Sequence, residues 1–258
     1  MREICSGRPG VSVGDLVSQS KSSKYVSRGG EKLAAALDHF DIDVADRVCA
    51  DLGSHVGGFV DCLVQRGAAR VYSVDTSYGT LAWKLRRDPR VVVLERTNAM
   101  HVVLPEPVDL VTIDVGWTPQ SKILPGTAGL LRPRYTQDAP SIGAAPVRKR
   151  EPTAQQPLPN GRGSESDRPA QSSSTKPAPS CGADKTGSNV LTLIKPHYEA
   201  LKDQLDAGVL PDEWVDGVVH DTVEQMKASG WHVVGIVESP IRGHAGNREF
   251  FALLEIKK

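Results

Sequence analysis

The stretch "VCADLGSHVGGFVDCL", residues 48–63, decides the fold of this chain. A short apolar segment ends at Asp51 and Leu52, glycines follow, and a second apolar segment begins at Phe59. Glycines allow a tight turn and let a ligand approach the backbone closely. The stretch therefore predicts a strand, a glycine turn and a helix, in the order found in nucleotide-binding α/β sheets.

The glycine spacing alone does not identify the ligand. Gly53, Gly57 and Gly58 do not fit the G-x-G-x-x-G pattern of NAD-binding turns. Asp75 ends the next predicted strand, where an acid can accept both hydroxyls of an adenosine ribose. Asp51 and Asp75 could each merely end a strand or a turn, but together, after successive strands, they favour nucleoside binding.

The rest of the chain alternates between strands and helices, which predicts an α/β fold. Helical periodicity appears in residues 31–40, 59–67, 81–87 and 215–230. Strands separated by helices imply a mostly parallel sheet, and the last two strands, joined only by a loop, should pair antiparallel. The predicted strands are residues 47–52, 70–75, 90–95, 110–115, 189–195, 231–238 and 249–256.

Four ionisable residues should meet at one edge of this sheet. Sites in open α/β sheets form beyond the carboxyl ends of the parallel strands, and Asp114 and Lys195 end two of them. Glu249 begins the antiparallel last strand and so reaches the same edge, while Lys32 in the leading helix could fold over it. From spacing alone, Lys32 and Glu249 could equally be ordinary charged residues at the rim of the sheet, with no role in a site. Desolvation at a strand end would favour the neutral form of Lys195.

Composition limits the class of protein. The 31 basic and 31 acidic residues cancel, so no strong overall field points to nucleic acid or membrane. No apolar run approaches the roughly 20 residues of a membrane span, and the N-terminus lacks the apolar core of a signal peptide. The cysteines have no metal-type spacing, which predicts no metal site and a reducing, cytoplasmic setting.

The sequence predicts one folded domain with two additions. Residues 133–188 are rich in Pro, Ser, Gly, Gln and Ala, with few large apolar residues. Such a segment cannot bury enough apolar surface to offset ordering entropy, which predicts a disordered insertion. Residues 1–23 form an N-terminal extension, and residues 24–258 form the domain that the insertion interrupts.

Several long motifs carry a family resemblance. They are "YVSRGGEKL", "DLGSHVGGFVDCLVQRGAARVYSVD", "DLVTIDVGW", "LTLIKPHYEA" and "SPIRGHAGNREFF". Over residues 24–132 and 190–255 the chain resembles the catalytic domain of the TlyA-type (haemolysin A) proteins, among the FtsJ-like RNA 2′-O-methyltransferases. The resemblance implies a Rossmann-like, S-adenosylmethionine (SAM)-dependent methyltransferase fold of seven strands, the last of them antiparallel.

The resemblance also implies roles for individual residues. Its Lys-Asp-Lys-Glu catalytic tetrad falls on Lys32, Asp114, Lys195 and Glu249, with Glu199 as a rival for the glutamate. SAM would be held at the glycine turn, with Asp75 on the ribose and Asn98 near the adenine. The implied cofactor-binding residues are Asp51, Gly53, Ser54, Gly57, Gly58, Phe59, Asp75, Asn98 and Asp114.

The chemistry implied is methyl transfer to a ribose 2′-hydroxyl, which makes the substrate RNA and not DNA. In TlyA-type proteins the targets are cytidines of ribosomal RNA, so ribosomal RNA or ribosomal subunits are the expected partners. Residues 1–23 are too few for the S4-like RNA-binding domain that relatives usually carry. The basic stretches "KSSKYVSRGGEK" and "RGHAGNR" are therefore candidates for the RNA-binding face.

Two other functions are compatible with parts of this pattern. A catalytically weak RNA-binding or ribosome-assembly protein could retain the methyltransferase fold. A nicotinamide-dependent oxidoreductase would share the nucleotide-binding sheet, but the glycine spacing and the two lysines argue against it.

Overall fold

The computed structural model describes residues 24–133 and 187–257 of the chain. The predicted N-terminal extension, residues 1–23, lies outside the described residues. So does the predicted insertion, except for its ends at Pro133 and residues 187–188.

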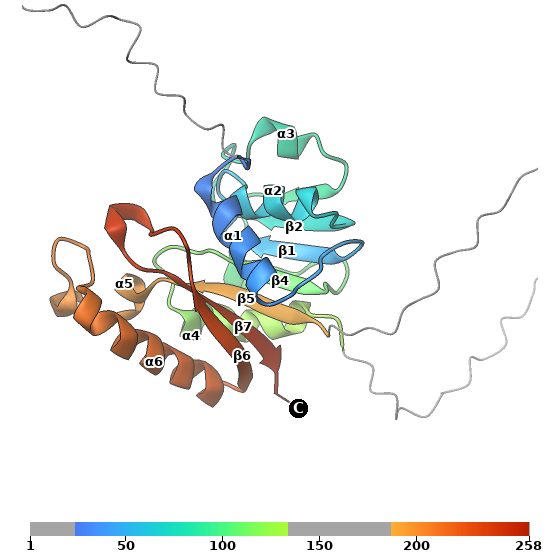
Figure 1. Cartoon of the computed structure of the whole chain (residues 1–258). Coiled ribbons are helices and arrows are strands. Elements are labelled where there is room, and N and C mark those ends of the chain that lie inside the picture. The colour runs from blue at the N-terminus through green and yellow to red at the C-terminus, as the bar shows by residue number, and fades with distance from the viewer. Residues whose placement is uncertain (1–23, 134–186, 258) are drawn as a thin grey trace, which may run out of the picture. The chain divides into compact units, whose positions relative to one another are not determined.

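One sheet of seven strands forms the centre of the fold, in the order β3-β2-β1-β4-β5-β7-β6 (Figure 1). β1 to β5 are parallel to one another, and β7 lies antiparallel between β5 and β6. This confirms the predicted seven-stranded, mostly parallel α/β sheet with an antiparallel last strand. The strands are β1 (Val48–Leu52), β2 (Arg70–Val74), β3 (Val91–Leu94), β4 (Leu110–Ile113), β5 (Asn189–Ile194), β6 (Trp231–Glu238) and β7 (Phe250–Ile256).

Helices cover both faces of the sheet because alternate strand residues point to opposite sides. Cys49 and Leu191 face a core formed with α1 and α2, whereas Ala50 and Val190 face a second core formed with α4 and α6. The α-helices are α1 (Arg28–His39), α2 (Gly58–Gln65), α3 (Trp83–Arg86), α4 (Gln120–Thr127), α5 (Pro196–Glu199) and α6 (Asp212–Ala228). The 3₁₀ turns are η2 (Ala99–His101), η3 (Ala128–Leu130), η4 (Lys202–Gln204) and η5 (His244–Gly246). None of the described helices is long and apolar enough to cross a membrane.

The differences from the sequence prediction include the extents of α3 and α6. The stretch predicted as a helix over residues 81–87 makes only the single turn α3, and α6 begins three residues before the predicted Val215. The earlier start of α6 follows from Asp212 and Glu213, because acidic side chains in the first turn stabilise a helix through its dipole.

The glycine turn is built as the sequence predicts. Gly53 has a φ of +91°, and a Cβ atom there would lie 2.4 Å from the carbonyl oxygen of Asp114, at the end of β4. Gly57 has a φ of +94°, and a Cβ atom there would collide with Leu81 and Leu85. Only glycine fits both positions. Gly53 lets the end of β1 lie against the end of β4, and Gly57 lets Leu81 and Leu85, in and beside α3, pack against the turn.

Candidate active site

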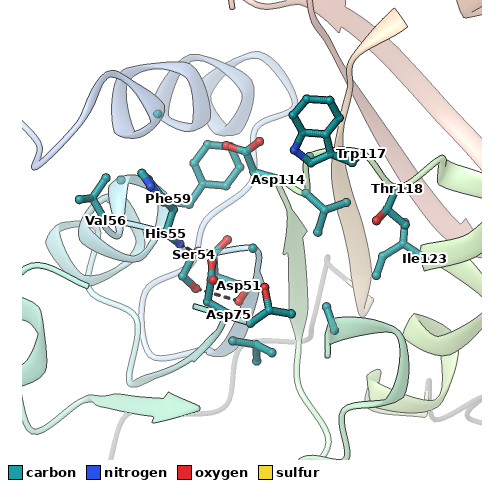
Figure 2. Close-up of a pocket in the computed structure, with 18 of the residues that line it drawn as sticks. Asp51, Ser54, His55, Val56, Phe59, Asp75, Asp114, Trp117, Thr118 and Ile123 are labelled. Carbon is teal, nitrogen blue, oxygen red and sulfur yellow. Dashed lines mark hydrogen bonds between the residues drawn. The ribbon is translucent and has the colours of Figure 1, made fainter. Parts of the chain in front are cut away.

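The carboxyl ends of β1, β2, β4 and β5 border a cavity of about 650 Å³. Figure 2 shows Asp51, Asp75 and Asp114 around it, each from the end of a different strand. Two predicted site residues are not part of the lining: Gly57, which packs against Leu81 and Leu85, and Glu249. The predicted residues that line the cavity are Lys32, Asp51, Gly53, Ser54, Gly58, Phe59, Asp75, Asn98, Asp114 and Lys195.

Lys195 and Asp114 form an ion pair at one side of this cavity. The Lys195 Nζ lies 2.6 Å from the Asp114 Oδ1, and both side chains are largely buried. Lys195 follows the last residue of β5, and Asp114 follows the last residue of β4, the neighbouring parallel strand. The two side chains therefore meet because their strands end at the same edge of the sheet.

The protonation state of Lys195 differs from the sequence expectation. Burial alone lowers the pKa of its ammonium, as expected at a strand end, but Asp114 and then Glu249 favour the charged form more strongly. The net effect raises the pKa of Lys195 above its usual value of 10.5. The expectation of a partly neutral lysine is therefore wrong, because it took account of desolvation and not of the two carboxylates nearby.

Lys32 and Glu249 form a second ion pair, and this one is buried. The Lys32 Nζ donates to the Glu249 Oε2 at 2.6 Å. Lys32 lies in α1, and Glu249 immediately precedes β7, so the pair joins the first helix to the last strand. Gly243 makes room for it, since a Cβ atom there would lie 2.1 Å from the Glu249 Oε1. The structure thus brings together the four residues that spacing could only place at the same edge.

Glu199, the rival glutamate, has a different partner. Its Oε1 accepts a hydrogen bond of 2.9 Å from the backbone N–H of Gln120, the first residue of α4. Burial raises the pKa of Glu199, and this hydrogen bond opposes the rise. The carboxyl group caps a helix, whereas Glu249 contacts a cavity-lining lysine, so the geometry favours Glu249 as the fourth member of the set.

Asp75 has a polar environment that keeps it ionised. Its Oδ2 accepts from the backbone N–H of His55 at 2.7 Å, and its Oδ1 accepts from the N–H and the hydroxyl of Ser77. Burial raises the pKa of this carboxyl, but the hydrogen bonds outweigh burial and lower it overall. Asp75 is therefore held rigidly at the end of β2 as an acceptor, beside the glycine turn.

Asp51 has the opposite environment, although it lines the same cavity. It is almost fully buried, and its Oδ1 accepts from the hydroxyl of Thr112 at 2.7 Å. Its Oδ2 is buried and has no hydrogen-bond partner among the described residues. Burial raises the pKa of Asp51 to about 7, with Thr112 opposing the rise and the neighbouring Asp114 and Asp75 adding to it. A donor that entered the cavity would satisfy this oxygen.

The raised pKa of Asp51 predicts that stability falls as pH rises from 4 to 7. In this range the unfolded chain ionises its aspartate, whose ordinary pKa is 3.8, while the native protein keeps the proton. Asp51→Asn should remove this dependence, because the amide mimics the protonated acid, and should stabilise the protein above pH 7 by a few kcal/mol. Urea unfolding of both proteins at several pH values measures the effect. Parallel pH dependences for parent and variant would contradict it.

Sequence reasoning missed an aromatic pair at the cavity. Trp117 lines the cavity, is highly exposed and has a φ of +65°, which is unusual for a bulky residue. Its ring centroid lies 5.1 Å from that of Tyr198, whose ring lies 5.9 Å from the Lys195 Nζ. The "GW" that follows Asp114 and the "HY" that follows Lys195 are the signal, since both pairs come just after strand ends that carry site residues.

One of the two expected basic faces is largely neutralised within the protein. In the stretch "RGHAGNR", Arg242 pairs with Asp212 at 3.3 Å. Arg248 pairs with Glu238 at 2.8 Å and with Asp216 at 3.2 Å. These arginines hold the loop before β7 against α6 and β6, which makes them weaker candidates for RNA phosphate than the stretch around α1.

Comparisons with known proteins agree with this architecture. The family model of the FtsJ-like methyltransferases matches residues 25–256. The 16S/23S rRNA (cytidine-2′-O)-methyltransferase TlyA of Mycobacterium tuberculosis is 33% identical over 266 aligned residues, which cover 96% of this chain and 76% of the relative.

Solved structures extend the comparison. A hemolysin-type protein from Streptococcus thermophilus is 28% identical with a TM-score of 0.69, over 93% of this chain and 70% of that one. A more distant structure, the 1,6-didemethyltoxoflavin N1-methyltransferase of Burkholderia thailandensis, has a TM-score of 0.50 at 12% identity and shares the fold. The alignment covers 90% of this chain and 79% of that one.

Proposed function

Because the chain belongs to the FtsJ-like methyltransferase family, we propose that it transfers a methyl group from SAM to a ribose 2′-hydroxyl of RNA, with a cytidine of ribosomal RNA as the target. The observation that carries this proposal is the pairing of Lys195 with Asp114 and of Lys32 with Glu249, beside a cavity that begins at a glycine turn. A ribosomal RNA substrate implies a cytoplasmic protein.

The residues around the cavity fit SAM. The unpartnered Oδ2 of Asp51 suits a ligand with an amino group, and the tight turn at Gly53 lets a ligand reach the backbone. Asp75 and Asn98 would hold the ribose and the adenine side, with Ser54, Gly58 and Phe59 at the other end of the cofactor. SAM supplies a sulfonium-bound methyl group that is already activated for attack by a nucleophile.

The protein must therefore position and deprotonate the hydroxyl. Lys195 can accept the proton only after losing its own, and Asp114 fixes its ammonium at the edge of the cavity. Lys32 can donate to the hydroxyl oxygen, and its hydrogen bond to Glu249 fixes the position of that ammonium. The exposed ring of Trp117 offers a face on which the base of the target nucleotide can stack.

The two alternatives are weaker. A ribosome-assembly protein without catalysis would not need the two lysine–carboxylate pairs at the cavity, and the relatives' names do not favour it. A nicotinamide-dependent oxidoreductase does not agree with membership of a methyltransferase family.

The proposal is tested by methyl transfer from labelled SAM to isolated ribosomal subunits, total RNA and DNA. RNA recovered after the reaction is digested to nucleosides, and the labelled product is identified by chromatography. We expect 2′-O-methylcytidine from ribosomal RNA and no label in DNA. Label on a base, or no transfer with any RNA under conditions where SAM binds, would contradict the proposal.

Asp75→Ala should weaken SAM binding by about 1–3 kcal/mol, the usual range for hydrogen-bond partners left unsatisfied. The carboxylate would accept from the ribose hydroxyls, and alanine leaves them without a partner. Calorimetric titration with SAM measures the loss. Asp88→Ala is the control, because it removes an acid that pairs with Arg90 outside the cavity lining. Equal affinity of the folded Asp75→Ala protein and its parent would remove Asp75 from the cofactor site.

A further inference from the structure

Trp83, the first residue of α3, is an exposed tryptophan among cations. It is 72% exposed, and the next seven positions hold Lys84, Arg86, Arg87 and Arg90 against the single acid Asp88. Tryptophan is enriched at binding interfaces, because it combines a large apolar ring with a polar N–H group. An indole face with basic neighbours is the combination that single-stranded nucleic acid uses, through base stacking and phosphate contacts.

The position of α3 is fixed relative to the cavity. The backbone N–H of Ala82 donates to the carbonyl of Val56, a cavity-lining residue, at 3.1 Å. Leu81 and Leu85, on either side of Trp83, pack directly against Gly57 in the glycine turn. An RNA strand bound at Trp83 would therefore lie next to the cavity and not on a distant face.

A buried carboxylate joins α3 to the segment that leads into α1. The Asp61 Oδ2 lies 2.9 Å from the Lys84 Nζ and accepts from the backbone N–H of Val26 at 2.8 Å. Figure 1 shows α3 close to the start of this segment. Lys24 and Arg28 are thereby brought to the side of α3, and Arg28 also lines the cavity. The stretch "KYVSRGG" and the stretch "WKLRR" thus form one basic surface.

Several of these cations have no acidic partner among the described residues and are therefore available to bind phosphate. Arg86 and Arg90 are paired with Glu95 and Asp88, but Lys24, Arg28 and Arg87 form no ion pair with a described residue. The Lys24 Nζ lies over the ring of Tyr25 at 5.2 Å, which leaves its charge uncompensated by an acid. Binding to phosphate would release counterions from the RNA, a gain that grows with each unpaired cation.

We propose that Lys24, Arg28, Trp83 and Arg87, the Trp83 surface, hold the RNA strand that leads into the cavity. An unpaired base stacks on the indole of Trp83, and phosphates on either side contact the cations. This inference rests on the proposed RNA substrate and adds the site at which that RNA docks outside the reaction centre. RNA is favoured over a protein partner because this surface is basic and continues into the cavity where a ribose must enter.

Trp83→Ala should weaken binding of a ribosomal RNA fragment by between about 5-fold and 150-fold, the effect of losing one base–aromatic stack. SAM affinity should not change. Trp83→Phe keeps an aromatic face and should retain most of the RNA affinity, while losing the quenching of Trp83 fluorescence that RNA causes in the parent. Filter binding, fluorescence titration and calorimetry with SAM measure these three quantities.

The chain offers a matched control. Trp214 is 50% exposed at the start of α6, but it stands among acids, with Asp212 and Glu213 before it and Asp216 after it. Trp214→Ala should leave RNA binding unchanged. An equal loss in both alanine variants would mean a general effect of removing tryptophan and would overturn the proposal.

A second variant does not depend on Trp83. Arg87→Gln should make RNA affinity less sensitive to salt. The slope of log affinity against log salt concentration should become shallower by about 0.7, the value expected when one phosphate of a single strand is no longer neutralised. If Trp83→Ala and Arg87→Gln both bind RNA as the parent does, and the parent methylates RNA, then RNA does not dock at the Trp83 surface. The proposed function would still stand. Weaker RNA binding by these variants, with a parent that methylates no RNA, would support the surface and contradict the proposed function.

Discussion

Replacing Lys195 with arginine or with alanine is expected to lower methyl transfer to RNA by at least about 10²-fold while SAM binding is retained. The ammonium of Lys195 lies 2.6 Å from Asp114 at the edge of the cavity, where a ribose hydroxyl would face the methyl donor. Arginine keeps the positive charge but cannot give up a proton, so it cannot then accept one. Alanine removes both the charge and the base.

The raised pKa of Lys195 adds a pH signature to this prediction. Asp114 and Glu249 hold its pKa above 10.5 despite burial, so at pH 7 to 9 the neutral form is a small fraction that grows about tenfold per pH unit. If the neutral amine is the base, the single-turnover rate of the parent should rise with pH over this range. The residual rate of Lys195→Arg should not follow that rise.

The measurement is single-turnover transfer of labelled methyl to RNA with SAM saturating. Lys122→Arg, at an exposed lysine of α4, is the control for a change of lysine to arginine as such. An arginine variant almost as active as the parent would make Lys195 an electrostatic clamp and not a base. Full activity of both variants would remove Lys195 from the reaction centre.

Lys32→Met is expected to lower the free energy of unfolding by about 3–5 kcal/mol and to abolish methyl transfer. Glu249 is buried, and its Oε2 accepts from the Lys32 Nζ at 2.6 Å, so removing the lysine leaves a buried carboxylate without its counter-charge. The double variant Lys32→Met/Glu249→Gln should recover a large part of the stability, because the stranded charge is gone. It should remain inactive, because the ammonium that would contact the hydroxyl is still missing.

Urea unfolding measures the stability of the two variants, and transfer assays measure their methyl transfer to RNA, so an effect on folding can be told from an effect on catalysis. Lys227→Met serves as the control, since Lys227 pairs with Glu224 on the exposed side of α6, where an ion pair contributes less than about 1 kcal/mol. A double variant that regains activity along with stability would show that Lys32 has only a structural role. A single variant as stable as the control would show that the pair is not buried in solution.

The elements that the sequence could predict are those in which one local rule decides the outcome. The apolar runs that became β1 to β7 are short and end in polar or glycine residues, so periodicity locates them. α4 escaped prediction because Pro125 and Gly126 lie inside it, and both residues normally argue against a helix. Its start is stabilised by Glu199, which lies 79 positions away in the sequence.

In the candidate site, too, some residues could be located from local sequence, whereas others depend on contacts between distant parts of the chain. Asp114 and Lys195 could be located because each follows an apolar strand, and parallel strands end at one edge. The pairing of Lys32 with Glu249 could not be read from spacing, since it depends on how α1 lies against the loop before β7. The charge of Lys195 was misjudged for a related reason, because its pKa depends on carboxylates that only the folded chain brings near.

The position of β7 between β5 and β6 has a consequence for the timing of synthesis. Residues 250–256 are translated after the other six strands of this sheet, yet they must insert between two of them. Until then β5 has an open edge that could pair with another chain. Lys32 also lacks its partner Glu249, which lies 217 positions further along the sequence. Contacts of such long range form slowly, so the Lys32–Glu249 pair should be among the last parts of the molecule to assemble. A nascent chain halted before β7 would contain most of the residues that line the cavity and still be unable to complete the Lys32–Glu249 pair.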